Sequence, residues 1–178
     1  MIDPLVYTEA VELIESHQEA GRRVYLVSAS PEEIVFPLAR HLGVDSAIAT
    51  RARIDNEGRY TGEVEFYSAG EGKVEAINEE AERFDIDLEG SFAYSDSVTD
   101  LPMLETVGHP VAVNPDRALL KEAISRGWEI RVFERPQPLV EGRGVRPPKP
   151  MTFGALGAAT LAGGLLWWKT RKPIGRRR

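Results

Sequence analysis

The sequence predicts an α/β fold: a doubly wound, Rossmann-like parallel sheet, followed by an apolar helix near the C-terminal end. Short apolar segments of strand length alternate with longer amphipathic segments of helix length between residues 4 and 133. The first strand-like segment is apolar enough to be buried on both faces, as in a sheet with helices on each side. The chain has 178 residues and no Cys, so one packed core without disulfides is expected.

Local signals mark where the predicted elements begin and end. The helix over 8–20 has apolar residues on one face and is followed by Gly21, a typical residue after a helix end. Residues 30–33, Ser-Pro-Glu-Glu, form a capping-box pattern that predicts a helix running to Gly43. The predicted elements are, in order, helix 8–20, strand 23–28, helix 31–42, strand 47–53, strand 59–67, helix 73–84, strand 91–95, helix 101–107, strand 110–114, helix 115–126 and strand 129–133.

The composition changes after residue 133. Residues 134–150 contain five Pro and several bases, which predicts a linker. Residues 151–168 carry no charge, and as a helix they would reach about 27 Å, close to the thickness of a bilayer core. Residues 169–178 form a basic tail that suits an anionic, cytoplasmic lipid surface. We therefore expect a cytoplasmic protein that is membrane-associated through 151–178; a helix packed on the protein and a disordered tail are the alternatives.

The charge distribution argues against one class of partner. Residues 151–178 carry six bases and no acid, so the first 150 residues have a net charge of −12 and the remainder +6. A protein that binds nucleic acid presents a basic face on its folded domain. The acidic body therefore excludes nucleic acid as the expected partner.

Polar residues stand at the ends of three predicted strands. Ser28 and Asn114 end two of them, and Asp96 directly follows a third. In open parallel sheets, ligands bind beyond the carboxyl ends of the strands. Ser28, Asp96 and Asn114 are therefore expected to line one edge of the sheet.

Two carboxylates and a lysine could bind a metal and a phosphate at that edge. Asp96 and Asp100 are four residues apart where a strand turns into a helix, and such oxygen ligands suit Mg²⁺. Alternatively, both acids only stabilise the first helical turn. Lys73 stands at a helix start, where a cation is unfavourable unless an anion binds there. Its alternative role is a solvated surface lysine.

In order and spacing, these segments resemble the haloacid dehalogenase (HAD) superfamily, in particular its phosphoserine-phosphatase-like subfamily IB, over about residues 4–133. The strand ending at Ser28 and the turn that follows resemble the second motif, in which the serine binds the transferred phosphoryl group. Lys73 in Gly-Glu-Gly-Lys resembles the third motif, in which the lysine neutralises phosphate and nucleophile. The Asp96–Asp100 segment resembles the fourth, whose acids hold Mg²⁺.

The resemblance implies roles for individual residues. It implies catalytic roles for Lys73, Asp96 and Asp100, with Mg²⁺ held by Asp96 and Asp100. It also implies that the substrate phosphate is bound by Ser28, Ala29, Lys73 and Thr99. Phosphoserine phosphatases usually have Asn at the position of Thr99, so phosphoserine is only one candidate substrate, and small amine phosphates and lipid phosphates remain open.

One motif of the family is missing. The family's first motif, Asp-x-Asp-x-Thr/Val after an apolar strand, carries the nucleophile, and no segment of this chain matches it. Asp85-Ile86-Asp87 does not end an apolar strand and is expected to be a solvated loop. By resemblance, the sheet lacks its central first strand, between the strands ending at Ser28 and Ser95. We therefore expect this chain to be an N-terminally truncated form of a longer protein.

The expected function is a HAD-type, Mg²⁺-dependent phosphomonoester hydrolase that is present here without its nucleophile motif. The alternative is a non-catalytic remnant that binds phosphate or lipid at a membrane. The sequence leaves the substrate and the oligomeric state open.

Overall fold

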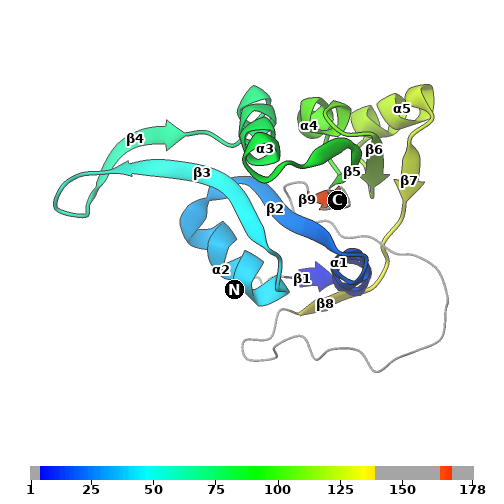
Figure 1. Ribbon diagram of the computed structural model, residues 1–178, viewed down its shortest axis with the longest axis horizontal. Coiled ribbons are helices and arrows are strands. Elements are labelled where there is room, and N and C mark those ends of the chain that lie inside the picture. Colours follow the sequence, from blue (N-terminus) through cyan, green and yellow to red (C-terminus); the bar gives the residue numbers. More distant parts are fainter. Residues whose placement is uncertain (1–4, 139–164, 170–178) are drawn as a thin grey trace, which may run out of the picture.

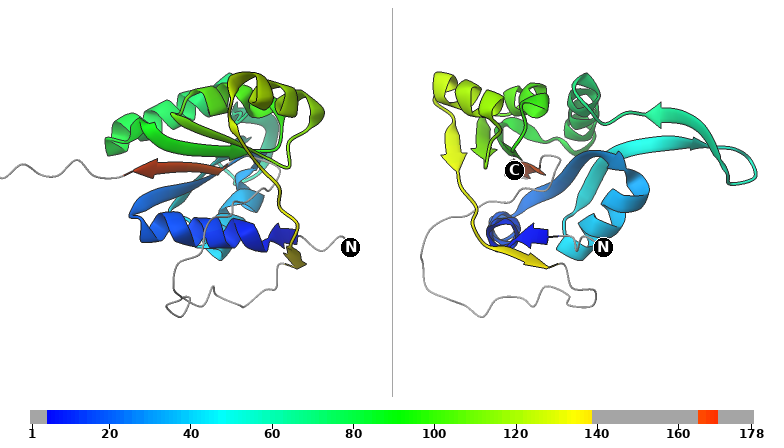
Figure 2. Two further views of the ribbon diagram at one scale, coloured as in Figure 1. Left: turned by 90° about the vertical axis from the view of Figure 1, so that its right-hand side faces the viewer. Right: turned by 180° about the vertical axis from the view of Figure 1, so that it is seen from behind.

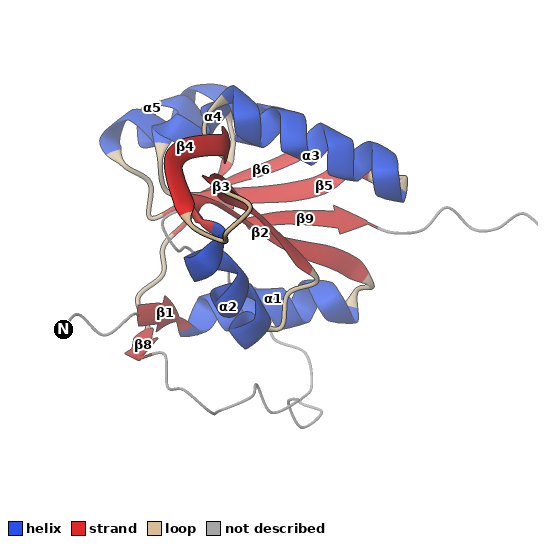
Figure 3. Cartoon of the chain, turned by 90° about the vertical axis from the view of Figure 1, so that its left-hand side faces the viewer, coloured by secondary structure: helices blue, strands red, loops and turns tan. Residues whose placement is uncertain are grey.

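A computed structural model describes residues 5–138 and 165–169 of the chain. These residues form a sheet with helices on both of its faces (Figure 1, Figure 3). Helices α1 and α2 cover one face, and α3, α4 and α5 cover the other (Figure 3). The layered arrangement confirms the predicted α/β fold class.

The elements follow the predicted order closely. The helices are α1 Thr8–Glu19, α2 Glu32–Leu42, α3 Glu71–Phe84, α4 Leu101–Glu105 and α5 Arg117–Arg126, with a 3-10 turn at Val98–Asp100. The strands of the main sheet are β2 Arg22–Pro31, β3 Ser46–Ile54, β4 Tyr60–Phe66, β5 Asp87–Ser95, β6 His109–Val113, β7 Glu129–Arg131 and β9 Leu165–Lys169. Gly43 and Gly127 end their helices with left-handed backbone, as glycines after a helix commonly do.

The predicted capping box at residues 30–33 does not form. Strand β2 continues through Ser30 to Pro31, and α2 begins at Glu32 without a side-chain cap. The reason is strand pairing, because Pro31 still lies opposite Thr50 of β3. The Ser30 backbone N–H donates to Ser28 Oγ at 3.1 Å within this last part of β2.

The centre of the sheet differs from the prediction. The strand order is β4-β3-β2-β9-β5-β6-β7, and β9 lies between β2 and β5, antiparallel to both (Figure 3). The helix predicted over 151–168 is therefore wrong for residues 165–168, while 151–164 lie outside the described residues. Strands at the centre of a sheet leave costly unpaired backbone groups if they lack a neighbour. Strand β9 supplies that neighbour at the position predicted to be without a strand.

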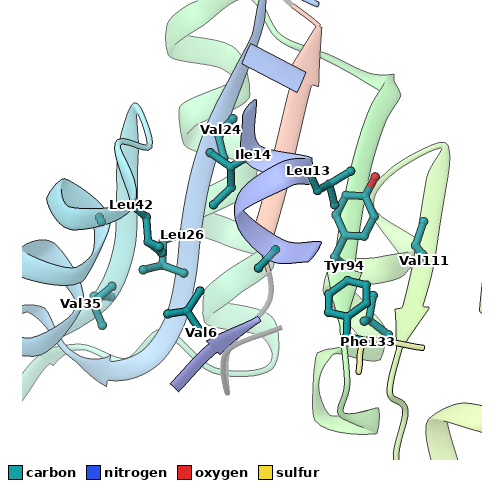
Figure 4. Packing of buried hydrophobic residues seen from close by; sticks show 14 residues of the cluster. Val6, Leu13, Ile14, Val24, Leu26, Val35, Leu42, Tyr94, Val111 and Phe133 are labelled. Atoms are coloured by element: carbon teal, nitrogen blue, oxygen red, sulfur yellow. The ribbon is translucent and has the colours of Figure 1, made fainter. Parts of the chain in front are cut away.

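The hydrophobic core lies on both faces of the sheet. On one face, α1 packs with residues of β2, β5 and β6, so it joins the two halves of the sheet on either side of β9 (Figure 4). The labelled residues of this cluster include Leu13, Ile14, Val24, Leu26, Tyr94, Val111 and Phe133. On the other face, α3, α4 and α5 bury Ile77, Met103, Leu104 and Leu119. Burial of this apolar surface is the main force that holds the layers together.

The folded body extends beyond the predicted boundary at residue 133. Arg135 pairs with Glu9 at 3.0 Å and with Glu12 at 2.7 Å, both on α1. Strand β8, Pro136–Pro138, pairs with β1, Leu5–Tyr7, in a separate antiparallel ladder. The predicted linker over 134–150 is thus part of the body up to residue 138, and residues 139–150 lie outside the described part.

Strands β3 and β4 form an arm that projects from the body (Figure 1, Figure 2). All of β4 is exposed except Phe66, which is half-buried, whereas Ile48, Ala49 and Thr50 of β3 are buried. The arm therefore emerges from the core directly after Thr50. Within residues 5–138 and 165–169, no helix is long and apolar enough to cross a membrane.

Candidate active site

The carboxyl ends of β2 and β5 meet at one edge of the sheet. Both strands are antiparallel to β9 and hence parallel to each other. The pairing of β9 begins at Leu165, opposite Leu26 and Tyr94, two residues before Ser28 and Asp96. The polar groups at this edge therefore lie beyond the part of the sheet that β9 occupies.

Lys73 and Asp100 form a buried ion pair at this edge. Their exposed fractions are 3% and 4%, and Lys73 Nζ bonds to Asp100 Oδ1. Ser95 Oγ donates to the other carboxylate oxygen, Asp100 Oδ2, at 2.7 Å. Buried charges require such partners. Lys73 therefore lies inside the protein in the first turn of α3, and the alternative of a solvated surface lysine is wrong.

Asp96 lies half-buried beside this pair. Burial, more than any other cause, raises the pKa of Asp96, and the negative charges of Asp100 and Asp116 raise it further, while Lys73 lowers it. A cation placed between the two carboxylates would relieve this repulsion. Asp96 and Asp100 are thus a place where an added positive charge is favourable.

These oxygen donors fit Mg²⁺ that is shared with a substrate. Among residues 5–138 and 165–169, no group of three or more His, Cys, Asp or Glu side chains is placed to hold a metal. However, Mg²⁺ commonly uses one or two carboxylates and completes its shell with water and substrate phosphate. The hydrogen-bonded oxygens of Asp100 keep lone pairs for coordination. Asp96 and Asp100 would hold such an ion.

Ser28 and Ala29 lie near the end of β2, where its pairing with β3 shifts register between Val27 and Pro31. Ser28 is buried, and its Oγ accepts the Ser30 backbone N–H. The carbonyl of Ala29 accepts a hydrogen bond from Thr50 Oγ1 at 2.8 Å. Thr50 Oγ1 in turn accepts the backbone N–H of Ser68 at 3.2 Å. The turn after Ser28 is thereby tied to the loop that leads into α3 and Lys73.

A scan against protein-family models matches residues 1–105 to the haloacid dehalogenase-like hydrolase family. The chain belongs to this family. A HAD relative from Streptomyces azureus, called an inhibition of morphological differentiation protein, is 49% identical over 97% of this chain and 64% of its own length. A probable phosphatase of Mycobacterium tuberculosis is 51% identical over 92% of this chain and 57% of its own.

A solved HAD structure shows the same fold. A substrate-bound phosphoserine phosphatase superposes with a TM-score of 0.56 and 25% identity, over 70% of this chain and 57% of that one. The chain thus spans between 57% and 64% of the length of these three proteins.

Asp116, which was not among the predicted site residues, orders the edge of this HAD chain. Its Oδ2 accepts the Val98 N–H at 2.9 Å, and its backbone N–H donates to the carbonyl of Asp96 at 2.7 Å. Its Oδ1 caps α5 by accepting two backbone N–H groups, and such bonds lower the pKa of Asp116. The position of Asp116 just before a helix was the available signal. The predicted helix start at Pro115 is two residues too early.

Asn114 follows β6, and its side chain is engaged by the segment after β7. Its backbone is left-handed, with φ of 42°, and its side chain pairs with both backbone groups of Phe133, at 2.9 and 3.2 Å. The amide therefore extends the pairing of β6 and β7. Thr99 is exposed in the turn, and its Oγ1 lies 3.0 Å from Ser97 Oγ.

Two acidic features of the HAD chain lie away from the edge. Asp85 ends α3 with left-handed backbone, but Ile86 is buried and Asp87 is already the first residue of β5, where its Oδ1 accepts the Gly90 N–H, so the predicted solvated loop is wrong for Ile86 and Asp87. An open groove of about 670 Å³ lies between α3 and α4. Its lining contains none of the candidate site residues, so the edge of the sheet, not this groove, is the candidate active site.

Proposed function

We propose that this chain supplies the phosphate- and Mg²⁺-binding part of a HAD-type phosphomonoester hydrolase. The observation that carries the proposal is the buried Lys73–Asp100 pair beside Asp96, at the carboxyl edge of the sheet. A buried cation next to two carboxylates is suited to hold a doubly charged anion together with a divalent metal. The related probable phosphatase supports the same chemistry.

Each residue of the edge has a role in this proposal. Lys73, together with the N-terminus of α3, balances the charge of the phosphoryl group. Ser28 Oγ and the backbone N–H of Ala29 donate to phosphoryl oxygens, and Thr99 contacts the remainder of a small substrate. Asp96 and Asp100 hold Mg²⁺, which when bound neutralises charge on the phosphoryl oxygens. Preorganised charges in such a site are the largest contribution to many enzymatic rates.

The same proposal assigns the nucleophile to a segment that these 178 residues do not include. No Asp-x-Asp-x-Thr/Val pattern occurs in the sequence. Hydrolysis of phosphate monoesters is among the slowest uncatalysed reactions, with enzymatic accelerations of up to about 10²¹-fold. Charge and positioning at Lys73 and Asp96 do not replace covalent attack by a carboxylate.

Hydrolysis of p-nitrophenyl phosphate with Mg²⁺ tests this proposal. The chain would be compared with a version extended to any upstream in-frame start, each with Asp96→Asn and with Asp85→Asn as the control on an exposed turn. We expect activity in the extended protein only, lost in Asp96→Asn and kept in Asp85→Asn. Activity of this chain alone that depends on Asp96 would refute the assignment of the nucleophile.

The missing motif also favours a second candidate function, a non-catalytic protein that binds phosphate or lipid headgroups. Phosphate binding without hydrolysis in either version would support it. The proposed membrane attachment rests on residues 151–164 and 170–178, because residues 165–168 already pair within the sheet. Flotation with anionic vesicles tests the attachment by comparing the full chain with a protein that lacks residues 151–178. If equal fractions of both proteins float with the vesicles, the attachment is refuted.

A further inference from the structure

Thr50 and Ser68 form the base of the β3–β4 arm. Thr50 is the last buried residue of β3, 9% exposed, and Ser68 follows β4 and is completely buried. Between them the chain leaves the core and returns (Figure 2). Neither residue belongs to a motif that the sequence analysis identified.

The Thr50 hydroxyl joins two segments that carry phosphate-binding residues. Because a hydroxyl has one hydrogen, the two contacts assign its roles: it donates to Ala29 O at 2.8 Å and accepts the Ser68 N–H at 3.2 Å. Ala29 directly follows Ser28, and Ser68 is five residues before Lys73. The two bonds therefore relate the position of the Ser28 turn to that of the start of α3.

The chain between Ser68 and Lys73 folds back against the residue after β4. A Cβ on Gly72 would lie 2.2 Å from the Tyr67 carbonyl oxygen, so the two backbone segments are in direct contact. The Ser68 hydroxyl has no hydrogen-bond partner among the described residues. The Thr50 bond to the loop is made to the Ser68 backbone, and a shift of that backbone is passed on to Lys73.

We propose that Thr50 is a positioning residue that sets the distance between the phosphate-binding turn at Ser28 and the ammonium of Lys73. This inference rests on the proposed function of the edge as a phosphate site. Without the hydroxyl, the buried Ser68 N–H loses its acceptor, which is costly, and the exposed Ala29 carbonyl loses its donor, so the two segments are no longer held together and move apart. Valine has the shape of threonine, so Thr50→Val removes these bonds with little change in packing.

Titration of the full chain with inorganic phosphate and Mg²⁺, followed by ³¹P NMR, tests Thr50. The variants are Thr50→Val, Thr50→Ser, which restores the hydroxyl, and the matched control Thr106→Val. Thr106 Oγ1 also donates to a backbone carbonyl, that of Pro102 at 2.8 Å, but in α4. We expect Thr50→Val to weaken phosphate binding about five- to tenfold, or about 1–1.4 kcal/mol. Thr50→Ser and Thr106→Val should stay within about twofold.

Two outcomes would overturn the role of Thr50. One is equal affinity of Thr50→Val and Thr106→Val, since both variants lose a hydroxyl that donates to a backbone carbonyl and only the Thr50 hydroxyl also bonds to the loop before Lys73. The other is a wild-type chain that binds no phosphate. In contrast, phosphate binding without hydrolysis in the extended protein would remove the proposed reaction and leave the role of Thr50 standing.

Discussion

Removal of the Lys73 charge should be the most destabilising single change at the edge. In Lys73→Met, the carboxylate of Asp100, which is 4% exposed, keeps Ser95 Oγ as a partner but loses its cation. Breaking a buried pair in this way costs about 3–5 kcal/mol, because one charge stays buried and uncompensated. A domain of this size is stable by about 5–15 kcal/mol in total. The melting temperature should therefore fall by about 6–20 °C.

Urea unfolding followed by circular dichroism measures this loss. Lys121→Met on the exposed side of α5 is the matched control and should change the free energy of unfolding by less than about 0.5 kcal/mol. The double variant Lys73→Met/Asp100→Asn should lose less than the sum of the two single changes, because the pair is removed together. A loss below about 1 kcal/mol for Lys73→Met, or strict additivity, would refute a buried, coupled pair.

Three further changes test other parts of the structure. The pKa of His17 is lowered to about 2, by burial first and by Arg22 second, so the unfolded chain binds its proton more readily. Stability should therefore fall as pH drops below about 6.5, by up to ~1.4 kcal/mol per pH unit, and His17→Phe should reduce this slope in urea titrations at several pH values. Gly108→Ala would place a Cβ 1.9 Å from the Glu89 carbonyl oxygen, so the thermal transition should be lost or strongly lowered; an unchanged melting temperature would contradict this contact. Asp116→Ala should cost about 1–2 kcal/mol in urea, whereas Asp116→Asn should retain most of the cap; equal losses would disprove the capping role.

Much of the fold could be predicted from periodicity and from glycine and proline positions. The helix over 8–20 was placed correctly because its apolar spacing and Gly21 agree, and the structure has α1 at Thr8–Glu19. The helix start near Ser30 was placed too early, because pairing of Pro31 with Thr50 extends β2. Such pairing is a contact between segments distant in sequence, and local patterns do not contain it.

The candidate site could be predicted only in part, because some of its contacts again join segments that are distant in the sequence. Local patterns indicated the places of Lys73 and Asp96, because the start of a helix and the end of a strand can be recognised from neighbouring residues. It did not show that Lys73 and Asp100, 27 residues apart, are buried against each other. Thr50 was missed because its hydrogen bonds reach 21 residues back and 18 residues forward. The bonds of the Asn114 side chain to Phe133 were not predicted, because the two residues are 19 positions apart in the sequence.

The antiparallel direction of β9 has different consequences for the pairing of the sheet and for the candidate site. Its backbone pairs with β2 and β5, which satisfies the centre of the sheet. Because β9 is antiparallel, its first residue, Leu165, lies on the side of the candidate site and its last, Lys169, at the opposite end. A strand parallel to β2 would instead end at the site and could present the residues that follow it to the phosphate. Strand β9 thus restores the pairing of the sheet without bringing a carboxylate to that edge. We therefore expect residues 1–178 to fold and bind phosphate without hydrolysing it.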